Sequence, residues 1–224
     1  MLQRFTDILL ATFALILLSP LLVLISLILR FTGEGEVFYK QERVGRGATK
    51  FQLMKFATMM KDSPNIGTGT ITIENDPRVL PLGSILRKTK INELPQLINV
   101  VLGDMSLIGP RPLTDETFAA YSADAQEIIT KIQPGLSGLG SIVLRNEEKL
   151  LTGVNEHRSF YFEVVAPYKA ELEIWYYNHR SYALYLTLVV VTVHVVIFAD
   201  SKIIWKRFKD LPPLPSELSI RLEN

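Results

Sequence analysis

A long apolar segment opens the chain. Ile8 to Leu29 comprises 22 residues without a charged side chain, enough for a helix to cross a bilayer. Ser19-Pro20 lies in its middle, and because proline has no N–H, the carbonyl of Ile16 needs another donor, such as the Ser19 hydroxyl. Hydropathy leaves two interpretations open: one kinked spanning helix, or a helix that bends at Ser19-Pro20 and returns to the same face.

Two shorter patterns follow. The β-type runs 37–39 and 50–53, separated by Gly45-Arg46-Gly47, predict a hairpin with basic residues near its turn. Further on, apolar positions at helical spacing predict a helix that ends at Gly103, with Asn92 as its N-cap and Pro95 in its first turn. The apolar positions of that helix are Leu94, Leu97, Ile98 and Val101.

A second apolar run lies near the C-terminus. Tyr182 to Ala199 is 18 residues without a Lys, Arg, Asp or Glu, preceded by the aromatic cluster 175–177 and followed by the basic segment 202–210. Its length allows a second spanning helix. Because the basic segment behind it is typical of a cytoplasmic membrane surface, we expect instead a helix docked on the core or lying in the interface.

Composition narrows the chemistry. The net charge is +1, so bulk charge indicates no partner, but residues 30–61 hold seven Lys and Arg against three Glu. Such a stretch suits anionic lipid or phosphate, although a solvated basic face fits equally well. The absence of cysteine excludes disulfides and thiol nucleophiles, and the three histidines are scattered.

The segment 90–112 combines acid, amide and fixed cation. Asn92 and Glu93 stand at the predicted helix start, and Gly109-Pro110-Arg111-Pro112 forms a rigid turn with one arginine. A carboxylate among so many basic residues stays ionised and can hold Mg²⁺ or act as base or nucleophile. The alternative is that Asn92-Glu93 only begins a helix.

Several of these segments together resemble the bacterial sugar transferase family, the small monotopic phosphoglycosyl transferases. The resemblance covers most of residues 5–145, including the Ser19-Pro20 pair. The matching motifs are "FYKQERVG" (38–45), "KF-TM" (55–59), "LRKT" (86–89), "ELPQLINV" (93–100), "GDMSLIGPRPL" (103–113) and "PGLSGLGS" (134–141).

This resemblance implies an α/β fold on the cytoplasmic face of the bacterial inner membrane. It implies a re-entrant membrane helix in residues 1–31, hinged at Ser19 and Pro20, and a small catalytic core in 32–155. Residues 156–224 would supply interfacial, membrane-associated helices. The implied partners are a UDP-sugar, polyprenyl (undecaprenyl) phosphate, membrane lipids and Mg²⁺, and no nucleic acid.

The resemblance also implies a reaction and site residues. Family members transfer a sugar-1-phosphate from the UDP-sugar to the polyprenyl phosphate, release UMP and so begin surface glycan assembly; an Asp of an Asp-Glu pair attacks the β-phosphate. By position, Glu93 corresponds to the Glu of the pair and to a Mg²⁺ ligand. The expected phosphate-binding set is Arg87, Arg111, Lys55, Lys90 and Pro112.

This chain departs from the family pattern at three places. Asn92 replaces the usual Asp, and an amide cannot form the acyl-phosphate, so either Glu93 attacks, the lipid phosphate displaces directly, or the protein is a catalytically inactive homologue that binds nucleotide sugar or pathway partners. Ala57 replaces an arginine. The residues after Ser141, "IVLRNEEKLL", diverge from the commoner branch of the family, and the loop 145–148 within them either contacts the sugar or is solvated.

Overall fold

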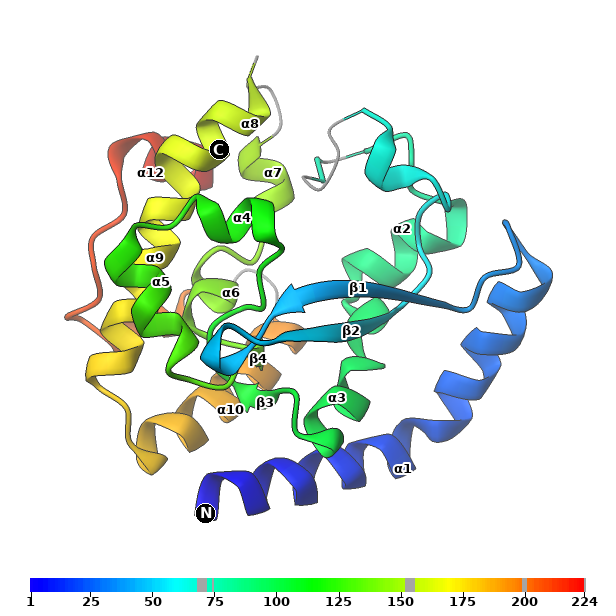
Figure 1. Ribbon diagram of the computed structural model, residues 1–224, viewed down its shortest axis with the longest axis horizontal. Helices are drawn as coiled ribbons and strands as arrows, with labels where there is room; N and C mark the ends of the chain where they lie inside the picture. Colours follow the sequence, from blue (N-terminus) through cyan, green and yellow to red (C-terminus); the bar gives the residue numbers. More distant parts are fainter. Residues whose placement is uncertain (68–71, 74, 152–155, 199–200, 224) are drawn as a thin grey trace.

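The computed structural model describes residues 1–67, 72–73, 75–151, 156–198 and 201–223, in which helices surround two small sheets (Figure 1). The strands are β1 (Phe38–Val44), β2 (Lys50–Phe56), β3 (Ser106–Ile108) and β4 (Gly135–Ser137). The longer helices are α1 (Leu2–Phe31), α2 (Pro81–Lys88), α3 (Gln96–Leu102), α5 (Ala123–Thr130), α9 (Ala166–Asn178), α10 (Tyr182–Ile197) and α12 (Ser216–Glu223). The short ones are α4 (Asp115–Ala119), α6 (Leu139–Val143), α7 (Glu147–Leu151), α8 (His157–Phe160) and α11 (Ile203–Arg207), with 3₁₀ turns η1 (Arg46–Ala48), η2 (Ser63–Asn65) and η3 (Ile91–Glu93) and a π-helical turn η4 (Tyr161–Val165).

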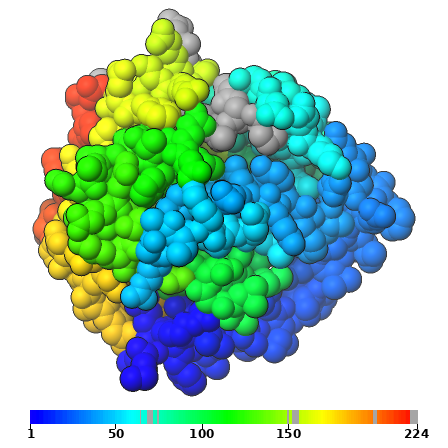
Figure 2. Space-filling model, viewed as in Figure 1, coloured from blue at the N-terminus to red at the C-terminus, as the bar shows by residue number. Residues whose placement is uncertain are grey.

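The apolar N-terminal segment forms one helix, α1, along the outside of the body (Figures 1 and 2). The expected break at Ser19-Pro20 is a bend: the helix remains continuous while its axis turns (Figure 1). As predicted, the Ser19 hydroxyl donates to the Ile16 carbonyl at 2.8 Å, because Pro20 cannot. Among the described residues, α1 is the one helix that is long and apolar enough to cross a membrane.

Both halves of α1 pack against the same globular body. Near its start, Ala11 is buried in a cluster with β2 and α3, and Arg4 donates to the carbonyls of Val100 and Val101 at the end of α3. Near its end, Ile25 and Leu29 are buried against β2 and α2. The remaining apolar side chains of α1 are largely exposed.

The predicted hairpin is confirmed. Strands β1 and β2 pair antiparallel from Phe38 opposite Phe56 to Val44 opposite Lys50. Gly47 has a positive φ of 68° in the turn, a conformation that glycine adopts without strain. The hairpin crosses the middle of the molecule, between α2 and α3 on one side and α4 to α6 on the other (Figure 1).

Strands β3 and β4 form a short parallel pair whose backbones approach closely. Ser106 lies opposite Gly135, and Ile108 lies opposite Ser137. A Cβ on Gly109 would lie 2.3 Å from the carbonyl oxygen of Gln133, so this position must be glycine. The turn that carries Arg111 therefore follows directly from a tightly held strand.

The main hydrophobic core runs from β3 to the C-terminal helices. Residues from Ile108 to Leu218 contribute to it, including α9 and one face of α10. On α10, Leu184, Leu188 and Val191 are buried, whereas Val190 and Val193 on the other face are 68% and 56% exposed. The expectation that this helix docks on the core is confirmed, and its outer face remains apolar; residue 199 of the predicted run lies outside the described residues.

Candidate active site

A cavity of about 890 Å³ opens between the hairpin, α2 with η3, the turn after β3, and α6 with α7. Its wall is unusually rich in charge. The basic lining residues include Arg43, Lys55, Arg87, Lys90, Arg111 and Lys169, and the acidic ones include Glu93, Glu147 and Glu148. Pro112 lines the cavity as well. All five residues expected to bind phosphate therefore line the same cavity.

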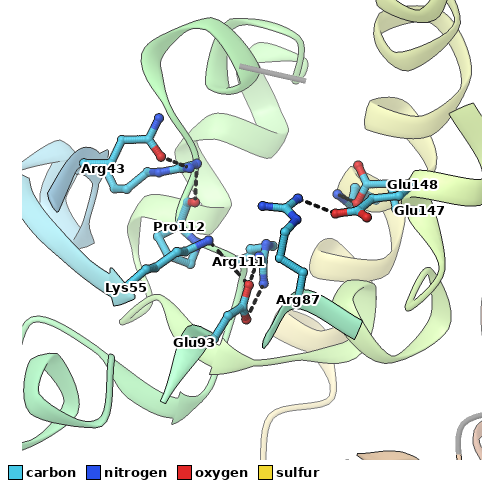
Figure 3. Close-up of polar contacts among 10 residues, drawn as sticks. Arg43, Lys55, Arg87, Glu93, Arg111, Pro112, Glu147 and Glu148 are labelled. Carbon is cyan, nitrogen blue, oxygen red and sulfur yellow. Dashed lines mark hydrogen bonds and ion pairs between the residues drawn. The ribbon is translucent and has the colours of Figure 1, made fainter. Parts of the chain in front are cut away.

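Glu93 faces the cations and contacts two of them, Arg111 and Lys55 (Figure 3). Its Oε1 accepts from Arg111 Nη2 at 2.6 Å and from Lys55 Nζ at 3.4 Å. Burial alone would raise the pKa of this carboxyl, but Arg111 and Lys55 outweigh burial and hold the pKa well below its usual range. Glu93 is thus ionised at every physiological pH.

Arg111 is held by the backbone on both sides of it. The Gly109 N–H donates to Ser137 O at 2.9 Å, and the Gly135 N–H donates to Pro110 O at 2.8 Å. Beyond Arg111, the Pro112 carbonyl accepts from Arg43 Nη1 at 3.1 Å (Figure 3). The proline-bounded turn thus presents its guanidinium in a fixed position, as the sequence indicated.

Burial, assisted by neighbouring positive charges, lowers the pKa values of two other cations. Burial, followed by the charges of Arg111 and Arg43, lowers the pKa of Lys55 to about 7, although Glu93 opposes this shift. Burial and Arg111 lower the pKa of Arg43 to about 10. An anion entering the cavity would relieve this repulsion, so the site favours a ligand with several negative charges.

Arg87 reaches the cavity from the last turn of α2 and forms an ion pair with Glu148 of α7. In the same wall, Lys169 Nζ donates to Glu147 Oε2 at 2.6 Å. Lys90 has a left-handed backbone, with φ 60°, directly before η3. This conformation costs energy for a residue other than glycine and often marks a functional site.

Asn92 does not cap a helix, contrary to the sequence prediction. It lies inside η3, and α3 begins only after Pro95, at Gln96. Asn92 is 5% exposed, and its Oδ1 has no hydrogen-bond partner within the described part of the chain. Asn92 is among the residues that line the charged cavity, and a buried amide oxygen without a donor there is a candidate contact for a hydrogen-bond donor of a ligand or for a cation.

Sequence reasoning missed part of this site. Arg43 belongs to the "FYKQERVG" motif but received no role, whereas Tyr161 and Lys169 come from the C-terminal third, which offered no chemical signal. Glu147 and Glu148, from the segment 145–148 that was expected either to contact the sugar or to be solvated, begin α7 and face the cavity (Figure 3). Ala57, at the position where the resemblance implies an arginine, also lines it.

One flank of the cavity is apolar. Leu18 and Leu21, on either side of the α1 bend, line it together with Val195 and Val196 of α10. The charged centre is thus continuous with the surface formed by the two most apolar helices. Such a cavity can accept a molecule with an anionic head and a hydrocarbon chain.

Known proteins resemble this chain over most of its length. Exopolysaccharide production protein ExoY of Sinorhizobium fredii is 36% identical over 166 residues, covering 68% of this chain and 73% of that protein. The uncharacterized sugar transferase EpsL of Bacillus subtilis is 31% identical, covering 89% of each. The UDP-glucose:undecaprenyl-phosphate glucose-1-phosphate transferase of Escherichia coli is 34% identical over 79% of this chain but only 38% of its own length.

The family model for bacterial sugar transferases matches residues 1–199, which include α1, the hairpin, every charged residue of the cavity named above and α10. Together with these relatives, the match establishes that the chain belongs to the bacterial sugar transferase family.

Proposed function

We propose that this protein transfers a sugar-1-phosphate from a UDP-sugar to undecaprenyl phosphate and releases UMP. The reaction would take place at the cytoplasmic face of the bacterial inner membrane, as the first membrane step of surface glycan assembly. The names of the relatives from Escherichia coli and Caulobacter vibrioides, both UDP-glucose:undecaprenyl-phosphate glucose-1-phosphate transferases, support this assignment.

One observation carries the proposal: the cation cluster around ionised Glu93 continues into an apolar flank between α1 and α10. The diphosphate of the donor and the phosphate of the lipid repel each other, so bringing them together requires fixed positive charge. Arg87 and Arg111 provide planar guanidinium groups suited to phosphate oxygens. The apolar flank gives the hydrocarbon chain of the acceptor a route from the membrane.

Direct displacement fits these residues better than attack by Glu93. Because Arg111 and Lys55 stabilise its negative charge, the Glu93 carboxylate is weakly basic and a poor nucleophile. In the proposed step an oxygen of the lipid phosphate attacks the β-phosphorus and forms a new P–O bond. The bond to the bridging oxygen of the α-phosphate breaks, and UMP leaves with its electron pair.

Magnesium is compatible with the residues present. Mg²⁺ in phosphoryl-transfer sites is commonly held by one or two protein oxygens and by substrate phosphates. Glu93, together with the unpartnered Oδ1 of Asn92, would hold it. The ion would supply neutralisation of the diphosphate charge, while Arg111 and Lys55 orient Glu93.

We also propose that α1 is re-entrant. A straight helix of 30 residues is about 45 Å long and would carry its ends to opposite sides of a bilayer. Instead, Arg4 and Asp7 near its start and Leu29 near its end all contact one globular body. The bend at Pro20 lets both ends stay on that side.

The test is UMP release by the purified protein in lipid nanodiscs with undecaprenyl phosphate, Mg²⁺ and a panel of UDP-sugars. We expect UMP only when donor and acceptor are both present. Glu93→Gln should lower the rate by about a hundredfold or more, because it removes the charge that orients Arg111 and holds the ion. Glu127→Gln, which alters an exposed ion pair with Lys131, is the matched control and should be neutral.

Two results would contradict the proposal. If no sugar of the panel gives UMP while an active relative does under the same conditions, the assigned reaction is wrong. If the donor alone releases one equivalent of UMP, a covalent intermediate forms and direct displacement is excluded.

Asn92 motivates a second candidate function, a catalytically inactive homologue that binds nucleotide sugar or pathway partners. Its amide stands where the resemblance implies the attacking carboxylate of the family. The two candidates differ in the effect of Asn92→Asp. Activity that arises only in the variant favours the inactive homologue, whereas an active wild type that the substitution changes little or slows favours the enzyme.

A further inference from the structure

A buried carboxylate lies near the start of the apolar helix. Asp7 is 2% exposed and is the one charged side chain buried within α1, a helix whose every residue the structure describes. Its Oδ1 accepts from Tyr185 Oη at 2.7 Å, from the Leu107 N–H at 2.9 Å and from Ser106 Oγ at 3.0 Å. A buried carboxylate is costly unless it is hydrogen-bonded, and these donors offset that cost.

The three donors belong to two elements other than α1. Tyr185 belongs to α10, while Ser106 and Leu107 begin β3. Asp7 therefore joins the membrane helix to the second apolar helix and to the strand between them. A side chain without an acceptor, such as leucine, would leave the Leu107 N–H and the buried Tyr185 hydroxyl without this partner.

Strand β3 leads directly to Arg111. Only three residues separate Leu107 from Arg111. Close backbone contacts of Gly109 and Gly135 between the two strands hold this stretch tightly in place. Beyond Arg111, the bond from Arg43 to the Pro112 carbonyl holds the other end. A shift of β3 at Leu107 would therefore be transmitted to the guanidinium that faces Glu93.

We propose that Asp7 is a positioning residue: by seating β3 against α1 and α10, it fixes Arg111 against Glu93. The packing of α1 against β3 would then also set the position of Arg111 in the phosphate-binding site. The functional consequence rests on the proposed function, but the mechanical link from Asp7 to Arg111 is a property of the fold.

The experiment compares Asp7→Leu, Asp7→Asn and Tyr185→Phe in nanodiscs with Thr6→Val as the control. Thr6 is the neighbouring residue and bonds Tyr182 rather than β3. One measurement is amide hydrogen exchange at Ile108, Gly109 and Arg111, beyond the amide that Asp7 itself binds. The other is the affinity for UDP with Mg²⁺, with and without Arg111→Ala.

We expect Asp7→Leu to accelerate exchange beyond Leu107 and to weaken UDP binding by about tenfold. In the Arg111→Ala background it should cause no further loss of affinity, because Asp7 acts through Arg111. Asp7→Asn keeps an acceptor and should retain part of the slow exchange and part of the UDP affinity. Tyr185→Phe should change both in the same direction as Asp7→Leu, but less. Thr6→Val should leave both unchanged.

Unchanged exchange beyond Leu107 in all three variants, or losses of affinity that multiply with Arg111→Ala, would overturn the inference. Absent UMP release or UDP binding by the wild type would count against the proposed function alone, since hydrogen exchange still decides whether Asp7 holds the segment of Arg111.

Discussion

Lys55 makes the site sensitive to pH near neutrality. Its pKa of about 7 means that it binds anions as a cation below that pH and loses its charge above it. The diphosphate of a UDP-sugar has no group that titrates in this range. We therefore predict that UDP-sugar affinity is highest below pH 7 and falls as the pH rises, by at most about tenfold per pH unit.

Lys55→Arg provides the control, because arginine stays charged throughout this range. Affinity in this variant should be nearly constant between about pH 6 and pH 9. Calorimetric titration across the range measures both proteins. An equal decline in both would assign the pH dependence to another group.

The residue scale also marks what sequence alone can reach. Glu93 and Arg111 were predicted because a helix-start acid and a proline-bounded arginine are local patterns. Lys169 was not, because its place opposite them depends on how α9 packs, and no short-range pattern encodes that packing. Asn92 was recognised as unusual, but its burial inside η3 was not foreseen.

At the scale of elements, local turn chemistry was a reliable guide where tertiary contacts did not compete with it. The hairpin and the end of α3 at Gly103, whose φ is 103°, followed the predictions from glycine. The start of α3 did not. Asn92 has the side chain of a good cap, but it is buried inside the tight 3₁₀ turn η3, and the helix begins after Pro95.

The β3–β4 pair gives a prediction at this scale. A Cβ on Gly109 would lie 2.3 Å from Gln133 O and 3.0 Å from Gly135 N, and both are backbone atoms that cannot move aside cheaply. We predict that Gly109→Ala lowers the free energy of unfolding by about 3 kcal/mol or more. Because the strands must separate, UDP affinity should fall as well, which calorimetry can measure alongside thermal unfolding.

Gly47→Ala is the control for Gly109→Ala, because it strains the backbone of a glycine without displacing the strand that leads to Arg111. Its Cβ meets nothing within 4 Å, so only the positive φ is penalised. It should cost about 1 kcal/mol and leave UDP affinity unchanged. If Gly109→Ala also keeps full affinity, the strand does not position Arg111.

At the scale of the whole molecule, re-entry can be tested with single cysteines, since the chain has none of its own. We predict that cysteines introduced at Leu2, the first residue of α1, and at Thr32, directly after its last residue, react with a membrane-impermeant maleimide in inverted vesicles but not in intact spheroplasts. The reason is that both ends of α1 bind one body. Opposite accessibility of the two positions would identify a spanning helix.

Hydropathy could not decide this topology, since a spanning and a re-entrant helix have the same composition. The contacts of Arg4 and Asp7 with residues 100–107 favour re-entry, and they depend on long-range packing that the apolar pattern conceals. The bend itself was predictable, because Ser19-Pro20 is a local signal.

The hydrogen bonds that Asp7 accepts from β3 and α10 have a consequence for biosynthesis. Its partners Leu107 and Tyr185 follow it by 100 and 178 residues. At about 5 to 20 residues per second, a ribosome delivers Tyr185 roughly ten to thirty-five seconds after Asp7. Throughout that interval the carboxylate of the nascent helix lacks at least the last of its three donors, so its final packing against the rest of the chain awaits the synthesis of α10.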